Sequence, residues 1–260
     1  MIGALAAGAI AIVGGVWHRH TASACHIDPH DTPPVSYTLT PEQATIATTI
    51  AAVAKRLGLA DHAVTVGLAA ALQESKLQNL AHGDRDSLGV FQQRPSQGWG
   101  TASEVMDPAF AAQSFFTHLA RVDNWENIPV TTAAQEVQRS GAPNAYAAWE
   151  PEARVLARAL TGQAPAAFTC TWPKPDTSST RLAETMDREL GTAAASAVKL
   201  GTTVSVQHGW TIAAWLVAHA RQFGISAVTF DGYRWTPKAT RWSHPGPASP
   251  RVRIESYLKS

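Results

Sequence analysis

The stretch from Ala70 to Arg94 constrains the fold and chemistry of this chain more than any other. Val64, Leu68 and Leu72 recur at helical spacing, so an apolar helix leads into it. Glu74 comes near the end of this helix, where its carboxyl borders apolar surface. Burial of this kind disfavours the charged form and raises the pKa of a carboxyl. The pattern therefore predicts a side chain that can donate a proton near neutral pH.

A polar loop punctuated by glycine follows the helix and holds Asp84 and Asp86. The pair Glu74-Ser75, followed later by the run GVFQ at residues 89–92, resembles the Glu-Ser and Gly-Leu-Met-Gln motifs of lytic transglycosylases and goose-type lysozymes. The longer run GDRDSLGVFQQRPSQGWG resembles the lysozyme-like domain of secreted actinobacterial cell-wall proteins. The resemblance covers roughly residues 25–170, a usual size for a domain.

The resemblance implies cleavage of the N-acetylmuramic–N-acetylglucosamine linkage of peptidoglycan, with Glu74 as general acid and base. A lytic transglycosylase needs only this one carboxyl. An inverting hydrolase uses a second carboxylate about 6.5–9.5 Å away to activate water. Asp84 and Asp86 are candidates for that second group, or they simply build a turn around Gly83. Both interpretations stay open, so the sequence does not decide between hydrolase and transglycosylase.

The same resemblance assigns contacts around the substrate to five further residues. Ser75 is expected to hydrogen-bond near the acid, and Gln92 to direct its amide at a substrate sugar. Gln93 either contacts the substrate or is structural. Trp99 either lines the cleft or fills the loop. Tyr146 either contacts the catalytic glutamate, as a late tyrosine does in transglycosylases, or packs between helices.

Residues 25–170 carry helix signals and no convincing strand, which predicts an all-helical domain. Thr40 and Gln43 form a capping box for a helix that ends near Leu57. Further helices are expected at about residues 61–76, 107–122, 131–139 and 143–160. Gln135 and Gln138 stand where the family has an Ala-Tyr-Asn motif, and the missing tyrosine leaves them without an assigned role.

The first 24 residues predict a signal peptide or a signal anchor, although no Lys or Arg precedes the apolar run. That run is shorter than the ~20 residues of a comfortable membrane span. Lipidation at Cys25 is disfavoured, because Ala22 stands where a lipobox normally has Leu. Cys25 and Cys170 bracket the lysozyme-like region, which in an exported protein favours one disulfide between them over two unrelated thiols.

Residues 171–180 are rich in Pro, Thr and Ser and predict a linker. Residues 181–260 predict a small α+β module. Its expected elements are a helix over 181–199, a strand over 203–207, a helix over 210–223 and strands over 225–231 and 252–257. The module weakly resembles a domain related to zinc D-Ala-D-Ala peptidases. Its His208, His219 and His244 do not reproduce the His–Asp spacing of those enzymes, so no metal site is predicted.

The amino-acid composition indicates a folded globular protein and argues against one class of function. Lys plus Arg number 21 and Asp plus Glu number 20, which argues against a nucleic-acid binder. A hydrophobic content of 45% is typical of a folded globule. Nine tryptophans suit carbohydrate stacking as well as core packing.

The sequence thus predicts an α+β chain with a lysozyme-like domain first and an α+β module of unknown role second. We expect it to be secreted, or anchored in the membrane by its N-terminus alone, to act on peptidoglycan glycan strands and to need no cofactor. Two rival hypotheses remain. One is a non-catalytic peptidoglycan-binding, secretion- or conjugation-associated wall protein that retains the fold. The other places peptidase activity in the C-terminal module.

Overall fold

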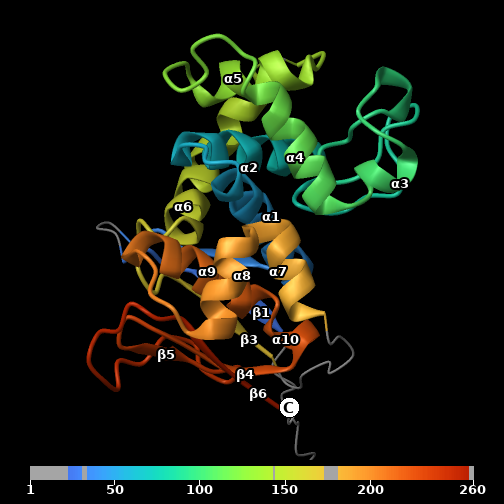
Figure 1. The fold of residues 1–260 in the computed structure, drawn as a ribbon. Coiled ribbons are helices and arrows are strands. Elements are labelled where there is room, and N and C mark those ends of the chain that lie inside the picture. Colours follow the sequence, from blue (N-terminus) through green and yellow to red (C-terminus); the bar gives the residue numbers. More distant parts are fainter. Residues whose placement is uncertain (1–22, 31–33, 143, 173–180, 258–260) are drawn as a thin grey trace, which may run out of the picture.

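The structure is a computed structural model that describes residues 23–30, 34–142, 144–172 and 181–257. Helices and strands both contribute, so the fold is α+β, as predicted (Figure 1). In chain order its elements are β1 (Ala24–Ile27), β2 (Tyr37–Leu39), α1 (Pro41–Arg56), α2 (Asp61–Ser75), η1 (Pro95–Gln97), α3 (Ala102–Val105), α4 (Pro108–Leu119), α5 (Val130–Gln138), η2 (Ala145–Trp149), α6 (Glu150–Leu160), β3 (Phe168–Thr171), α7 (Leu182–Leu190), α8 (Thr192–Leu200), α9 (Val206–Ala218), α10 (Ala220–Phe223), β4 (Ile225–Phe230), β5 (Tyr233–Trp235) and β6 (Arg253–Ser256).

Helix α1 lies at the centre of the fold and contacts helices from both halves of the chain. It begins with the predicted capping box: the Gln43 N–H donates to Thr40 Oγ1 at 3.2 Å, and the Thr40 N–H donates to Gln43 Oε1 at 2.9 Å. Ala44 and every residue from Ile46 to Ala54 are buried. Most of these side chains are small, so α2, α4, α7 and α9 can approach α1 closely, and one continuous core results.

Strands β1, β2 and β3 form an antiparallel sheet in the order β2-β1-β3. Cys25 of β1 pairs directly with Cys170 of β3, and the two side chains form the predicted disulfide. The prediction of an all-helical domain over residues 25–170 is therefore wrong, because this span begins and ends in strands. The strands have only three or four residues each, which is too short for a period of two to stand out in sequence.

The C-terminal half combines helices with a second antiparallel sheet, ordered β5-β4-β6. The helix predicted over 181–199 is two helices, α7 and α8, which meet at Gly191 with a φ of 92°. The strand predicted over 203–207 is wrong: Ser205 caps α9 by accepting a hydrogen bond from the His208 N–H. The strands predicted at 225–231 and 252–257 are confirmed as β4 and β6, whereas β5 has no counterpart among the predictions.

Buried polar contacts join the two halves. The Glu189 side chain of α7 is buried and accepts hydrogen bonds from Thr49 of α1 at 2.7 Å and from Trp215 of α9 at 2.8 Å. Trp235 of β5 donates its indole N–H to the Cys170 carbonyl at 3.0 Å. Because a buried carboxylate is costly without such donors, these bonds fix how α7 and α9 pack on α1.

Two of the predicted segments fall largely outside the described residues. Nearly all of the predicted export segment, residues 1–24, lies outside the described residues. Residues 173–180 of the predicted linker lie outside them as well. Over the part of the chain that the structure describes, no helix is both long enough and apolar enough to cross a membrane.

Candidate active site

Helix α2 carries Glu74 to the edge of the core. All residues from Ala63 to Leu72 are buried, which holds the helix in place. The helix ends after Ser75 because Lys76 and Leu77 adopt left-handed φ angles of 56° and 57°. Glu74 therefore lies in the last turn of a fixed helix and is half-buried.

Two polar side chains contact the Glu74 carboxyl. The Tyr146 hydroxyl donates a hydrogen bond of 2.7 Å to Glu74 Oε1, and the Gln138 side chain also hydrogen-bonds the carboxyl. Burial raises the pKa of Glu74 above its usual value. This effect outweighs the lowering of the pKa by the two hydrogen bonds and by the charge of Lys76. The shift has the direction that a proton donor requires.

Tyr146 reaches the acid from the short helix η2 and is fully buried. Its contact with Glu74, which the resemblance predicts, is present in the structure. Burial raises the pKa of the Tyr146 hydroxyl, so the group stays protonated and acts as a donor. The hydroxyl thereby fixes the orientation of the Glu74 carboxyl.

Gln138 is a member of the site to which the sequence assigns no role, although it stands where the family has its Ala-Tyr-Asn motif. It ends α5, and its Nε2 donates to the Phe91 carbonyl at 2.8 Å while the side chain also contacts Glu74. It thus joins the acid to the GVFQ loop. Its separation of 47 positions from Phe91 leaves no local spacing signal that could have identified it.

A cation lies beside the acid. Lys76 Nζ sits 3.9 Å from the ring centroid of Trp149, whose indole N–H donates to Gln73 at 2.7 Å. Burial lowers the pKa of Lys76, while the charges of Glu74 and Glu152 oppose that change. This ammonium favours the ionised form of Glu74 and so moderates the rise in the pKa of the acid.

Ser75 and Gln93 are both buried and donate to backbone carbonyls, which favours the structural interpretation of Gln93. Ser75 is 5% exposed, and its hydroxyl donates to the carbonyls of Val90 at 2.7 Å and Ala71 at 3.1 Å. Gln93 is 2% exposed and donates to the Ala111 carbonyl at 3.1 Å. Both side chains attach the GVFQ loop to helices, which is a structural role.

The Gln92 side chain hydrogen-bonds within the GVFQ loop and to the segment before it. Its amide nitrogen donates to the carbonyls of Gly89 at 3.1 Å and His82 at 3.4 Å. Contact of this amide with a substrate sugar stays a prediction. A Cβ at Gly83 would lie 1.9 Å from Gln92 Oε1. The loop therefore needs glycine at position 83 to keep Gln92 where it is.

The two aspartates of the loop have different surroundings. Asp86 Oδ1 accepts a hydrogen bond from Arg94 Nε at 2.7 Å and Oδ2 accepts one from the Ser96 N–H at 2.8 Å. These interactions hold the pKa of Asp86 well below its usual range. The Asp84 side chain is 92% exposed and lies 4.0 Å from Arg85. The turn-building interpretation of both residues fits these contacts better than the catalytic one.

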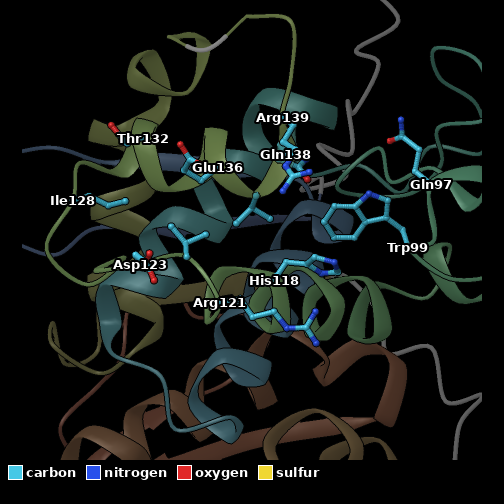
Figure 2. A pocket seen from close by; sticks show the side chains of 12 residues that line it. Gln97, Trp99, His118, Arg121, Asp123, Ile128, Thr132, Glu136, Gln138 and Arg139 are labelled. Carbon is cyan, nitrogen blue, oxygen red and sulfur yellow. The ribbon is translucent and has the colours of Figure 1, made fainter.

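A cleft of about 830 Å³ opens between the loop, α4 and α5 (Figure 2). Trp99 lines it, and the Trp99 ring lies against the His118 ring with 4.3 Å between centroids. On the facing side α5 contributes Glu136 and Gln138. Gln138 lines the cleft and also contacts Glu74, so this one side chain links the cleft to the acid.

The histidines of the C-terminal half do not form a metal site in the described residues. Across those residues, no group of three or more His, Cys, Asp or Glu side chains could hold a metal ion. His219 is buried, contacts the Trp215 carbonyl through Nδ1 at 2.8 Å and stacks on the Trp215 ring at 3.9 Å. Its surroundings are those of a packed core histidine.

No protein-family model matches this chain, and no curated protein matches it either. The geometry around Glu74 and the motifs that contain these residues are therefore the observations that point to a function.

Proposed function

We propose that this protein is an exported enzyme that cleaves the glycan strands of peptidoglycan at the N-acetylmuramic–N-acetylglucosamine linkage, with Glu74 as general acid and base. One observation carries the proposal. A half-buried carboxyl with a raised pKa is held by Tyr146 and by Gln138, and Gln138 also lines a large cleft. This is the arrangement that protonation of a leaving glycosidic oxygen requires.

In the first step, Glu74 gives its proton to the bridging oxygen as the bond from that oxygen to C1 of the muramyl sugar breaks. Positive charge then develops at C1 and the ring oxygen, and the new Glu74 carboxylate stabilises it. The Tyr146 hydroxyl and the Lys76 ammonium stabilise the same carboxylate, since both favour its charged form.

The surroundings of the aspartates favour a route that uses Glu74 alone. Both oxygens of Asp86 are occupied by Arg94 and Ser96, and Asp84 is exposed to solvent. In this route the Glu74 carboxylate takes the proton from the 6-hydroxyl of the muramyl sugar, and the resulting oxygen attacks C1. The products are an anhydro-muramyl end and a free 4-hydroxyl. No water is consumed, which distinguishes this lytic transglycosylase reaction from hydrolysis.

The proposal also covers where the enzyme works and what each part of the chain does. The disulfide between Cys25 and Cys170 supports an oxidising compartment outside the cytoplasm. In the proposed organisation residues 25–170 form the catalytic lysozyme-like part and residues 181–260 bind wall or position the enzyme. Helix α9 packs on α1, and the two parts of the chain share one hydrophobic core. This packing supports the proposal that the second part positions the first.

Digestion of purified cell wall by the wild-type protein and by Glu74→Gln tests the proposal. The amide keeps the size of the side chain and an acceptor for Tyr146 but has no proton to give. Loss of a general acid typically costs about 10²–10⁴-fold in rate. Glu126→Gln, an exposed change outside the cleft, is the matched control and should retain full activity.

Mass spectrometry of the released fragments identifies the reaction. Anhydro ends are expected, and reducing ends would instead show hydrolysis with a second group activating water. Failure of the folded wild-type protein to release any soluble fragment would refute the enzymatic proposal. Wall binding that survives in Glu74→Gln would then favour the non-catalytic alternative.

A further inference from the structure

A second pocket, of about 290 Å³, lies where the first sheet meets the C-terminal half of the chain. Residues of β1, β2 and β3 line it together with residues of β5 and of the segment after β5. Strands β1, β3 and β5 lie in the lower half of Figure 1, whereas α4 and α5, which line the first cleft, lie in the upper half. The pocket is therefore separate from the candidate active site, and the proposed cleavage does not use it.

Aromatic side chains line this pocket and stay partly exposed: Tyr37, Tyr233 and Trp242. Trp242 is held in place because its indole N–H donates to the Phe168 carbonyl at 2.8 Å. Trp242 and Tyr233 also pack edge-on against the buried ring of Trp210, with ring centroids 5.2 and 5.5 Å away. Both rings are thus fixed before any ligand arrives, so little conformational freedom is lost on binding.

Polar side chains lie among these rings. His26 of β1 and Thr38 of β2 both line the pocket, and His26 Nδ1 shares a hydrogen bond of 3.1 Å with Thr38 Oγ1. Thr240 and Arg241 line it from the segment after β5, and both are exposed. Arg241 supplies one positive charge and Asp28 one negative charge. The lining therefore combines hydrogen-bond donors and acceptors with flat apolar rings.

This combination fits a neutral sugar better than an ion. A sugar ring presents C–H groups on its faces, which pack on aromatic rings, and polar groups around its edge, which need hydrogen-bond partners. Arg241 and Asp28 have opposite charges, so a phosphate or carboxylate polymer gains no net attraction from the pair. The volume lies near the lower end of the range for small-molecule sites, about 300–1,000 Å³, so the pocket takes about one sugar unit of a longer strand.

We infer that this pocket is a second binding site for the glycan strand, which holds one N-acetylated sugar unit against Tyr37, Tyr233 and Trp242. The inference rests on the proposed function, because it takes the class of sugar from the proposed substrate. A protein held on the strand at a site remote from Glu74 stays on the wall after each cleavage. The C-terminal half thereby gains a defined role, since it supplies Tyr233 and Trp242 to the pocket.

Calorimetric titration with the tetramer of N-acetylglucosamine tests the pocket, and Glu74→Gln in the protein prevents cleavage during the measurement. Two binding events are expected, one in the cleft and one in the pocket. Adding Tyr37→Ala removes one ring of the pocket and should weaken one event at least about 10-fold, a usual loss when a contacting aromatic side chain is truncated. The other event should not change.

Tyr257→Ala is the matched control, because Tyr257 is an exposed tyrosine that follows β6 and lies outside the pocket. It should leave sugar binding unchanged. Thr240→Trp is a second test, which covers the case that Tyr37→Ala does not fold. A large side chain at this exposed position should fill the pocket and abolish the same event.

A proline-rich peptide is another ligand that aromatic-lined surfaces bind. A titration with a peptide of ten prolines separates the two ligands. Binding of this peptide that Tyr37→Ala abolishes, together with sugar binding that Tyr37→Ala leaves unchanged, overturns the inference in favour of a peptide site.

The outcomes separate this inference from the proposed function. If the wild type cleaves wall but Tyr37→Ala and Thr240→Trp leave every sugar-binding event unchanged, the inference is overturned and the enzyme proposal stands. If the wild type cleaves nothing, the enzyme proposal fails, and loss of sugar binding in both variants still supports the pocket as a glycan site. No binding of the tetramer at all overturns the inference.

Discussion

Replacing Tyr146 with phenylalanine tests how the acid is held. The change removes the hydroxyl that donates to Glu74 Oε1 at 2.7 Å and keeps the fully buried ring. A hydrogen bond to a charged group contributes about 1.5–3 kcal/mol. Glu74 is only half-buried, so water replaces part of that contribution and we expect a loss of about 1–2 kcal/mol.

The Tyr146 hydrogen bond stabilises the Glu74 carboxylate that forms when the proton leaves, so its loss raises the barrier of that step. A loss of about 1–2 kcal/mol corresponds to a rate lower by about 5- to 30-fold on intact wall. The pKa of Glu74 also changes, because the Tyr146 hydrogen bond lowers it in the wild type. Without that bond the pKa rises further, so the acid stays protonated to higher pH and the alkaline limb of the rate profile moves upward.

Release of labelled fragments from wall, measured over a series of pH values, provides both readouts. Tyr257→Phe, at an exposed tyrosine outside the cleft, controls for the general effect of removing a tyrosine hydroxyl. An unchanged rate together with an unchanged alkaline limb in Tyr146→Phe would contradict the assigned role of this hydrogen bond. A slower enzyme whose limb moves to lower pH would contradict the sign of the argument.

Two further predictions concern stability. Because burial raises the folded-state pKa of Glu74 above that of the unfolded chain, the folded state loses stability as pH rises from the unfolded pKa through the folded one. Glu74→Gln should therefore be more stable than the wild type in urea at neutral pH and equal to it in acid, and a variant less stable at neutral pH would contradict this. The disulfide closes a loop with a sequence separation of 145, for which chain entropy gives about 5 kcal/mol. The double change Cys25→Ala, Cys170→Ala should lower the free energy of unfolding by about 3–5 kcal/mol, whereas a loss below about 1 kcal/mol would show that strands β1 and β3 hold together without it.

Local sequence was sufficient to predict a structural feature where the interactions that form it lie within one helix. The capping box of α1 joins residues three positions apart, so Thr40 and Gln43 predicted the start of that helix correctly. Apolar spacing likewise placed Glu74 at the end of a buried helix. The cysteine pair was predicted because only two cysteines exist and they flank one region.

Local sequence did not predict the contacts of side chains that lie between several segments of the chain. For Gln93 the sequence left a substrate contact and a structural role open, and only the structure shows that Ser75 and Gln93 are buried and bond to backbone carbonyls of neighbouring segments. Gln138 stands where the family has its Ala-Tyr-Asn motif but lacks the tyrosine, so only the structure shows that it contacts both Glu74 and the Phe91 carbonyl. Strand β1 has no counterpart among the predictions, because its four residues gain their hydrogen bonds from β2 and from β3, and β3 lies far away in the chain.

The sequence by itself determined the type of each long helix, the disulfide and the presence of one carboxyl at the edge of an apolar core. Each of these follows from the spacing or the number of particular residues. Only the tertiary structure decided which side chains surround that carboxyl, which loop residues are structural and where the cleft lies. The reason is physical: burial and hydrogen bonding set the pKa and the role of a side chain, and both are supplied by residues that are distant in the chain.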